Sequence, residues 1–419
     1  MRFYFPDSQD QVDPSFDFLT EERSPFRIRQ RDDLYAHEVL DPVPYTGMLV
    51  SKAMVDGVDG GAGRYSAQQR QRLYRVGIRE FFRLNTPDRA HIETMGDCGA
   101  FTYVREDVPP YSVDDVIDFY EGCGFDAGIS LDHVILGFEL HAPLSADFVP
   151  EDWSQRRELT LQLAADFLRR HAERGCSFQP VGVAQGWSPE SYAASVEALQ
   201  KIGYGRIALG GMVAQKTHEI LAVLHDIDEI RDPATELHLL GITRTESIPE
   251  FASYGVTSFD STSPFRQAFK DDRDNYHADE RTFLALRVPQ AEGNVKLQRR
   301  IRAGEVDGAL ARRLERRALD TLRSFDAGRA TVDDAVEVLR DYERLHDGKR
   351  DRSHAYREVL ESAPWKSCEC AVCRSESIEV IIFRGTERNK RRGFHNLTVF
   401  ARRLERQLGQ PESLVPAGA

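Results

Sequence analysis

A repeated alternation of strand-like and helix-like segments limits the folds that this chain can adopt. Between Gly47 and Ser263, eight short apolar runs rich in β-forming residues are separated by loops and, in several places, by segments with helical periodicity. These runs are TGMLVSKAMV, REFFRLN, HIETMGDCGAF, AGISLDHVI, FQPVGVAQG, RIALGG, ELHLLGI and VTSFDST. Because right-handed crossovers join consecutive parallel strands, the pattern predicts an α/β fold of the (β/α)8 TIM-barrel type.

The sequence on either side of these runs differs in composition, and the chain is predicted to consist of four parts. Residues 1–46, rich in Asp and Pro, form an N-terminal extension, and residues 47–266 form the TIM barrel. Residues 267–354 are charged and form a mostly helical insertion, since ALARRLERRALDTLRSF and VDDAVEVLRDYERLH carry apolar residues at helical spacing. Residues 355–419 form a C-terminal module.

Composition excludes several classes of protein. No stretch of the 419 residues reaches the apolar run of about 20 residues that a membrane span needs, and the start MRFYFPDSQDQ lacks the apolar core of a signal peptide. We therefore expect a soluble, cytoplasmic protein without membrane contact. Six cysteines in such a chain do not form a disulfide framework. The net charge of -13 opposes indiscriminate binding to phosphate backbones but permits a local basic face.

The stretch CECAVC places three thiols within one tight turn. Cys368, Cys370 and Cys373 can point at a common centre, and His395 in GFHNLTVF is the nearest candidate for a fourth ligand. Between them we expect a strand at EVIIFRG and a basic turn at RNKRR. Three Cys and one His fit the closed tetrahedral shell of a structural zinc ion, so residues 355–419 are predicted to be a zinc-binding module. The alternative is a set of free buried thiols beside an unrelated histidine.

Three aspartates follow apolar runs at the predicted ends of strands. They are Asp97 in MGDCGAF, Asp132 in ISLDHVI and Asp260 in TSFDSTSP. TIM-barrel enzymes carry their chemistry at the carboxyl ends of the strands. A carboxylate there is costly unless it is paired or hydrogen-bonded, so each one caps a helix or belongs to a working site. Three in one barrel favour a catalytic site.

Two other strand ends carry residues that suit a flat ligand. VAQGW offers Gln185, and LGGMV offers Gly210 and Gly211. Glycine lets a ligand approach the backbone, and the Gln amide can both donate to and accept from a heterocycle edge. Together with the aspartates these residues suit a purine-like base. The alternative for the paired glycines is a tight turn.

The order of these motifs, closed by CECAVC and FHNL, resembles the tRNA-guanine transglycosylase superfamily, whose members exchange guanine for a 7-deazaguanine on a zinc-containing TIM barrel. The resemblance extends from Gly47 to Phe400, and the zinc spacing is its most specific part. It implies that Asp260 is the nucleophile that attacks C1′ of the nucleoside and holds the sugar covalently. It also implies that Asp97 is the general acid/base for the departing and arriving base, and that no redox or nucleotide cofactor is needed.

The same resemblance implies a pocket for the base. Phe101 falls where the family stacks an aromatic ring, and Leu240 is a candidate for the opposite wall. The guanine edge is read by side chains or backbone of Asp132, Gln185, Gly210, Gly211 and Met212.

The chain departs from the usual patterns of the tRNA enzymes, which are D-S-G-G-F/Y-Q, G-G-L-A-V-G-E and F-D-C-V-x-P-T-R. Here these stretches read DCGAFT, GGMVAQ and FDSTSPFR, so Thr102 replaces a Gln and the sixth-strand Glu has no counterpart. With the helical insertion and HADERTFLALRVPQ, they are similar to DNA-guanine transglycosylases of bacterial 7-deazaguanine DNA-modification systems. This implies guanine in DNA as substrate, 7-cyano-7-deazaguanine as incoming base, an ATPase or helicase-like partner protein, and a homodimer.

An enzyme that acts at C1′ needs a flipped or unpaired nucleotide and therefore a basic face. The first candidate is the zinc-proximal run Arg384, Arg388, Lys390, Arg391, Arg392, Arg402, Arg403 and Arg406, and the second is Lys296, Arg299, Arg300 and Arg302 of the insertion. The alternative is that these charges solvate helix faces. Two other functions remain open, a tRNA-directed exchange enzyme and a catalytically inactive nucleic-acid-binding scaffold.

Overall fold

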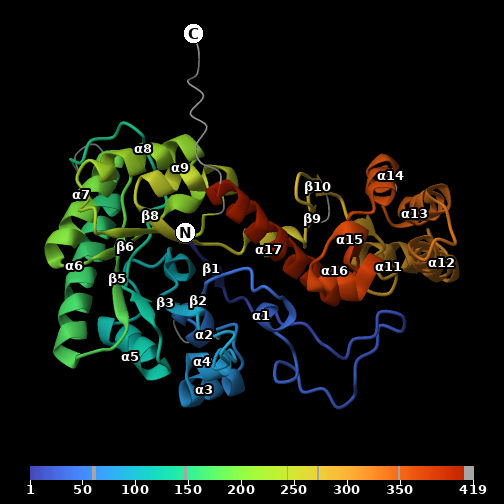
Figure 1. Ribbon diagram of the computed structural model, residues 1–419, viewed down its shortest axis with the longest axis horizontal. Helices are drawn as coiled ribbons and strands as arrows, with labels where there is room; N and C mark the ends of the chain where they lie inside the picture. The colour runs from blue at the N-terminus through green and yellow to red at the C-terminus, as the bar shows by residue number, and fades with distance from the viewer. Residues whose placement is uncertain (59–62, 146–148, 243, 271–272, 348–349, 410–419) are drawn as a thin grey trace, which may run out of the picture. The chain divides into compact units, whose positions relative to one another are not determined.

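The computed structural model describes residues 1–58, 63–145, 149–242, 244–270, 273–347 and 350–409 (Figure 1). The chain divides into two compact units. Of the described residues, those in 1–8, 45–262 and 407–409 form the first, here called the barrel unit, and those in 9–44 and 263–406 form the second, here called the helical unit. The insertion and the cysteine-containing segment thus belong to one unit, together with most of the N-terminal extension.

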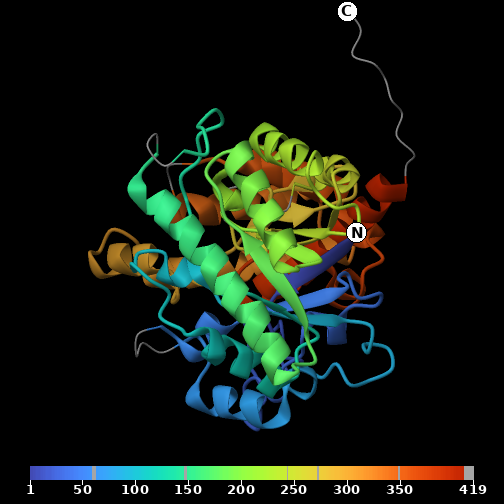
Figure 2. The ribbon, with the colours of Figure 1, turned by 90° about the vertical axis from the view of Figure 1, so that its left-hand side faces the viewer.

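The barrel unit is built on eight parallel strands that close on themselves, which confirms the predicted (β/α)8 TIM-barrel fold (Figures 1 and 2). The strands pair in sequence order, and β1 closes the barrel by pairing with β8 in the register Phe3 to Phe259. The strands are β1 (Arg2–Pro6), β2 (Gly47–Ser51), β3 (Glu93–Asp97), β4 (Ala127–Ile129), β5 (Gln179–Ala184), β6 (Arg206–Leu209), β7 (Glu236–Leu239) and β8 (Val256–Asp260).

The sequence reading assigned one strand wrongly. REFFRLN is not a strand but begins inside helix α4 (Ile78–Phe81), because the buried residues Ile78, Phe81 and Phe82 recur at helical spacing rather than alternating. The missing strand is β1, whose three aromatic residues are all buried. The prediction that residues 1–46 lie outside the barrel is therefore wrong for their first segment.

Helices with clear start and stop signals surround the strands. Helix α5 (Val113–Cys123) begins at Ser112, which forms a capping box with Asp115, and ends at the left-handed Gly124. Helix α7 (Pro189–Ile202) begins with proline after the capping Ser188. Figure 2 shows the long helix α6 (Glu151–Arg174), in green, along the outside of the strands. The others are α2 (Lys52–Asp56), α3 (Ala67–Val76), α8 (Thr217–Asp228) and α9 (Ile248–Ser253).

A polar cluster closes the amino-terminal end of the barrel. Arg206 is buried at the start of β6 and pairs with Glu93 at the start of β3, with 2.7 Å between Nη1 and Oε1. The other terminal nitrogen of Arg206 donates to the hydroxyl of Tyr4 at 2.7 Å. Apolar side chains such as Met95, Ile129 and Val183 fill the interior above this cluster. Ligand chemistry is therefore left to the opposite, carboxyl-terminal end.

The helical unit combines short strands with helices. Strand β12 (Ile382–Phe383) lies within the predicted strand EVIIFRG and pairs with β11 (Leu286–Arg287). The predicted basic turn RNKRR is wrong, because these residues lie inside the long helix α17 (Gly385–Gly409). The remaining elements are α1 (Ala36–Val39), α10 (Ser263–Gln267), β9 (Tyr276–His277), β10 (Thr282–Phe283), α11 (Val295–Arg302), α12 (Gly308–Asp326), α13 (Val332–His346), α14 (Ser353–Ser362), α15 (Pro364–Ser367) and α16 (Ala371–Glu376). Across the part of the chain that the structure describes, no helix has the length and apolar character of a membrane span.

Candidate active site at the carboxyl ends of the barrel strands

The three predicted aspartates gather at one end of the barrel. Asp97 is the last residue of β3, Asp260 is the last residue of β8, and Asp132 follows β4. Burial raises the pKa of Asp97 to about 7, and the charges of Asp132 and Asp260 push it in the same direction. Asp97 therefore lies within electrostatic reach of both other carboxylates. Hydrogen bonds from the backbone N–H groups of Gly99 and Cys98 oppose the shift.

Asp132 is held in a buried network. The Gln185 amide donates to Oδ2 of Asp132 at 2.6 Å, and the Cys98 thiol donates to Oδ1 at 3.1 Å. The backbone N–H of Ile135 donates in turn to Oε1 of Gln185 at 3.3 Å. Burial raises the pKa of Asp132 to about 6 even though the bonds from Cys98 and Gln185 lower it. Two of the residues predicted to read a base are thus fixed against each other.

The paired glycines make room for this network. A Cβ atom on Gly210 would lie 2.1 Å from Nε2 of Gln185. Gly211 has a φ of +73°, and a Cβ there would lie 2.7 Å from the carbonyl oxygen of Ile135. Both positions therefore require glycine for the approach of Gln185 and for the turn itself. Met212 starts the 3-10 turn Met212–Ala214 with its side chain buried, so only its backbone can face a ligand.

Asp260 is oriented by two donors, neither of which was predicted from the sequence. The backbone N–H of Gly241 donates to Oδ1 of Asp260 at 2.9 Å, and Nε2 of His238 lies 3.3 Å from the same oxygen. Nδ1 of His238 lies 2.9 Å from the Ser258 hydroxyl. Since a carboxylate only accepts, Nε2–H of His238 donates to Asp260 and Nδ1 accepts from Ser258. The signal in the sequence was a lone polar residue inside the apolar run ELHLLGI.

Burial keeps this histidine neutral. His238 is fully buried, and burial lowers its pKa even though Asp260 raises it. The ring also packs edge-on against Tyr4, with 5.5 Å between the ring centroids. His238 is therefore a fixed hydrogen-bond donor rather than a mobile charge.

The two predicted walls of a base pocket differ in exposure. Phe101 lies in the 3-10 turn Ala100–Tyr103 after β3, and its side chain is 51% exposed. Leu240 follows β7 and is half-buried against the barrel interior. Tyr103, at the end of the same turn as Phe101, donates to the Cys98 sulfur at 3.0 Å. Phe101 thus presents an uncovered ring on a turn anchored next to Asp97 and Asp132.

The helical unit contains a group that can hold a metal ion. The ligand atoms of Cys368, Cys370, Cys373 and His395 all lie within 4.8 Å of one another. Nδ1 of His395 faces the three sulfurs at 3.5, 3.4 and 3.3 Å, while Nε2–H donates to the carbonyl oxygen of His277 at 2.6 Å. Such an outer hydrogen bond fixes the tautomer of a ligating histidine. Three sulfurs and one nitrogen fit the donor set of a closed zinc site.

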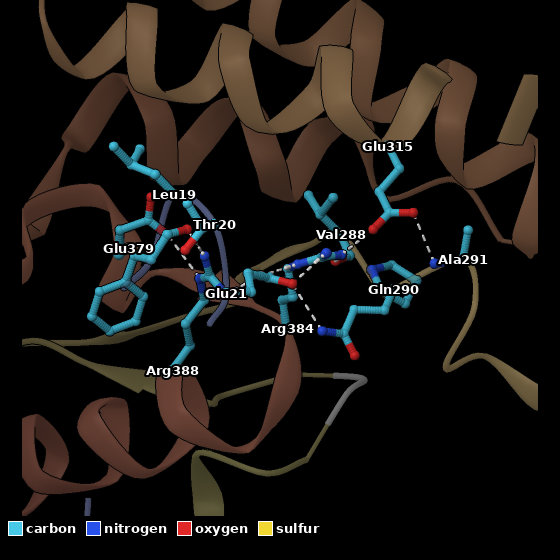
Figure 3. A network of polar contacts seen from close by, with 12 residues as sticks. Leu19, Thr20, Glu21, Val288, Gln290, Ala291, Glu315, Glu379, Arg384 and Arg388 are labelled. Atoms are coloured by element: carbon cyan, nitrogen blue, oxygen red, sulfur yellow. Dashed lines mark hydrogen bonds and ion pairs between the residues drawn. The ribbon is translucent and has the colours of Figure 1, made fainter. Parts of the chain in front are cut away.

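The part of the zinc-proximal basic run from Arg384 to Arg392 does not form an open face. Arg388, Arg391 and Arg392 are buried within the helical unit. Arg388 pairs with Glu21 at 2.5 Å and Glu379 at 2.7 Å, as Figure 3 shows together with Arg384. The structure therefore contradicts the prediction that these residues contact nucleic acid.

The physical reason is that the N-terminal segment covers this part of α17. Arg391 pairs with Glu387 at 2.7 Å and donates to the carbonyl oxygen of Asp13. Arg392 donates to the carbonyl oxygens of Val380, Ile382 and Ala268. Lys390 is half-buried, and its Nζ donates to the carbonyl oxygen of Gln11 at 2.6 Å.

Comparison with known proteins identifies the family. No family model matches the chain. A DNA-guanine transglycosylase of Salmonella montevideo is 49% identical over 409 residues, which cover 97% of this chain and 97% of the relative. The chain belongs to the DNA-guanine transglycosylase family. The predicted resemblance is confirmed, and the chain is a glycosyltransferase of the base-exchanging, transglycosylase type.

More distant relatives cover a smaller part of this transglycosylase. A queuine tRNA-ribosyltransferase of Stenotrophomonas maltophilia is 33% identical over 138 residues, which cover 32% of this chain and 36% of the relative. One from Pseudomonas syringae pv. tomato is 30% identical over 138 residues. These partial likenesses agree with membership of the wider tRNA-guanine transglycosylase superfamily.

Proposed function

We propose that this transglycosylase exchanges guanine in DNA for 7-cyano-7-deazaguanine through a covalent intermediate between Asp260 and the sugar. The observation that carries the choice of DNA is the 49% identity, over 97% of both chains, to a protein named DNA-guanine transglycosylase. The chemistry is supported by a carboxyl with a pKa of about 7 at the same barrel end as a second, doubly hydrogen-bonded carboxylate.

The exchange runs in two displacements. Asp260 attacks C1′ from the face opposite the base, so the C1′–O bond forms while the C1′–N9 bond breaks, and protonated Asp97 gives its proton to the departing guanine. The N9–H of the incoming base then loses its proton to the Asp97 carboxylate, and N9 attacks C1′ and displaces the Asp260 carboxylate. Two inversions retain the configuration at C1′. Because Gly241 and His238 both bind Oδ1, we assign the attack to Oδ2 of Asp260.

The base is held by the remaining residues of this barrel end. We propose that Asp132 and Gln185 bind the edge of the guanine-like ring, with backbone groups from Gly210 to Met212 completing the edge. Phe101 stacks on one face of the ring, and Leu240 faces the other. The exposed ring of Phe101 supports this role, because a base would cover it.

Radiolabelled guanine and 7-cyano-7-deazaguanine, offered in parallel with tRNA, single-stranded DNA and duplex DNA, test the proposal. We expect label to enter DNA. Label entering tRNA alone would select a tRNA-directed enzyme, and binding without exchange on any substrate would select the inactive scaffold. Since a target inside a stacked duplex must be extruded, exchange in single strands but not in duplex would support the proposed ATPase or helicase-like partner. Light scattering tests the proposed homodimer.

Asp97 should give the first half-reaction a pH dependence. Its carboxyl must be protonated to release guanine, so adduct formation in a single turnover should be constant below pH about 7 and fall about tenfold per unit above it. The Asp97→Asn variant should be slower and lose this dependence. A wild-type rate that is flat from pH 6 to about pH 9 would contradict the assignment.

The same raised pKa predicts a gain in stability on substitution. The native state binds the Asp97 proton more tightly than the unfolded chain, so wild-type stability is lost as pH rises from the unfolded pKa of 3.8 to about 7. Asp97→Asn should therefore be more stable at pH about 8, by on the order of 2 kcal/mol, with a difference that shrinks toward pH about 4. Urea denaturation at both pH values measures it.

His238 should act as a positioning residue for Asp260. His238→Phe removes the donor to Oδ1 and should lower kcat by roughly 10- to 100-fold with little change in KM, because the base does not touch this side chain. His238→Gln keeps an N–H donor and should recover part of the loss. Equal rates for the two variants would show that the imidazole only fills space. Steady-state exchange kinetics with labelled guanine distinguish these outcomes.

A further inference from the structure

Four exposed arginines on one helix of the helical unit have no acidic partner. Arg312, Arg313, Arg316 and Arg317 lie on α12 with exposed side chains, and none of the four makes a side-chain hydrogen bond or ion pair within the described residues. We call them the α12 arginine face. Other arginines of the same unit are paired: Arg323, on the same helix, pairs with Glu379 at 2.8 Å, and Arg384 pairs with Glu21 at 2.5 Å.

The arrangement of the four is unfavourable for the helix by itself. Arg312 and Arg316, and likewise Arg313 and Arg317, stand four residues apart, where like charges repel and weaken a helix. Surface helices usually relieve such repulsion with Glu at the neighbouring positions. Here the intervening Glu315 is buried and its Oε1 lies 2.6 Å from Nη1 of Arg384. Asp320 stands four residues after Arg316 and three after Arg317 but forms no ion pair with either among the described residues, so the helix offsets the repulsion only in part.

The face borders an open hollow between α12 and α13. Arg313, Arg316 and Arg317 line this hollow of about 640 Å³ together with Arg329, another exposed arginine for which the structure shows no side-chain partner among the described residues. Three carboxylates, Asp320, Asp334 and Glu337, line it too.

One of these carboxylates is held in a helix cap, and a second has only a long contact with another arginine. Asp334 accepts from the backbone N–H and hydroxyl of Thr331 at 2.8 and 2.7 Å in the cap of α13, and Asp320 lies 3.9 Å from Arg323. Glu337, the third carboxylate, has no side-chain hydrogen bond or ion pair within the described residues. The guanidinium groups outnumber the carboxylates that could neutralise them.

We propose that the α12 arginine face binds the phosphate backbone of duplex DNA. Arginines four apart on a helix are separated by about 6 Å along its axis, close to the ~6.8 Å that two nucleotide steps of one strand, at about 3.4 Å each, advance along the duplex axis. A guanidinium binds phosphate oxygens through paired N–H donors. This inference rests on the proposed DNA substrate. It would explain how a chain with a net charge of -13 binds a phosphate backbone, because the contact is made by a local cluster of arginines.

The test compares the full chain with R313Q/R316Q/R317Q by fluorescence anisotropy on a short labelled duplex at increasing KCl. Each lost phosphate contact lowers the slope of log affinity against log salt by about 0.9, so the slope should fall by about 2 to 3, with affinity about tenfold or more weaker at ~0.15 M salt. R313K/R316K/R317K should keep the wild-type slope, which separates loss of charge from loss of fold.

The matched control is R169Q/R170Q/R174Q on α6, which removes three charges from the barrel unit. An equal drop for this control would mean that only net charge matters and would overturn the proposal, as would an unchanged slope in the α12 variant. Loss of tRNA binding with intact duplex binding would assign the face to RNA and also overturn it. Base-exchange assays on the same samples separate this proposal from the proposed function. If the wild type incorporates no labelled base into DNA but its salt slope still depends on the α12 arginine face, the proposed function is refuted and the DNA contact is not.

Discussion

Asp260→Asn should abolish base exchange and leave no covalent adduct with guanine-containing DNA. The substitution keeps the size of the side chain and an oxygen that can accept from Gly241, so the fold should persist while the nucleophile is lost. Loss of a residue that forms the covalent bond lowers the rate on the order of 10⁴-fold or more. Denaturing gels of the enzyme trapped on labelled DNA measure the adduct, and labelled guanine measures the exchange.

The matched control for Asp260→Asn is Asp166→Asn on the outside of α6. Asp166 is exposed and pairs with Arg169 on the surface at 3.1 Å, so its loss should change neither adduct nor exchange. A stable adduct formed by Asp260→Asn would show that another group attacks C1′. Asp97→Asn provides an internal contrast, because it should slow adduct formation through the leaving base while the nucleophile remains.

Residues whose positions follow from local pattern could be predicted from the sequence. The three aspartates could be found because each one interrupts an apolar run at a strand end, and parallel strands bring such ends together. The cysteines could be found because three thiols in one turn have few other uses. His238 was missed because its role depends on the register between β7 and β8, which puts it opposite Ser258 and near Asp260.

The basic run could not be judged from local sequence. Glu21 and Arg388 are 367 residues apart in sequence, yet they pair at 2.5 Å and bury a charge that would otherwise face solvent. A pattern of Arg and Lys is the same whether the opposing carboxylates are distant along the chain or absent. The strand β1 was missed for a similar reason, because a single short aromatic run becomes a barrel strand through its pairing with β2 and with the distant β8.

Cys370→Ser should release the metal that we propose to be zinc and destabilise the helical unit. The sulfur of Cys370 lies 3.4 Å from Nδ1 of His395, and it also caps α16 by accepting from the N–H of Cys373 at 3.3 Å. Serine is a good N-cap, so the helix cap should survive the substitution. Any loss of stability then measures the loss of the metal ligand. We expect a fall in the free energy of unfolding of at least about 3 kcal/mol, because structural zinc contributes folding energy directly.

Metal analysis and thermal unfolding of Cys370→Ser beside Cys176→Ser separate a ligand from an ordinary thiol. Cys176 lies in the barrel unit, outside the Cys368–His395 group, so its variant should retain full metal content and near wild-type stability. A strong chelator should bring the wild type toward the melting behaviour of Cys370→Ser and leave that variant unchanged. Wild-type protein purified without zinc, or a Cys370→Ser variant holding one zinc per chain, would contradict the proposed site. Retained Asp260 adduct formation in metal-depleted enzyme would mean that the metal serves the fold and not the chemistry, which is what a closed shell of four protein ligands predicts.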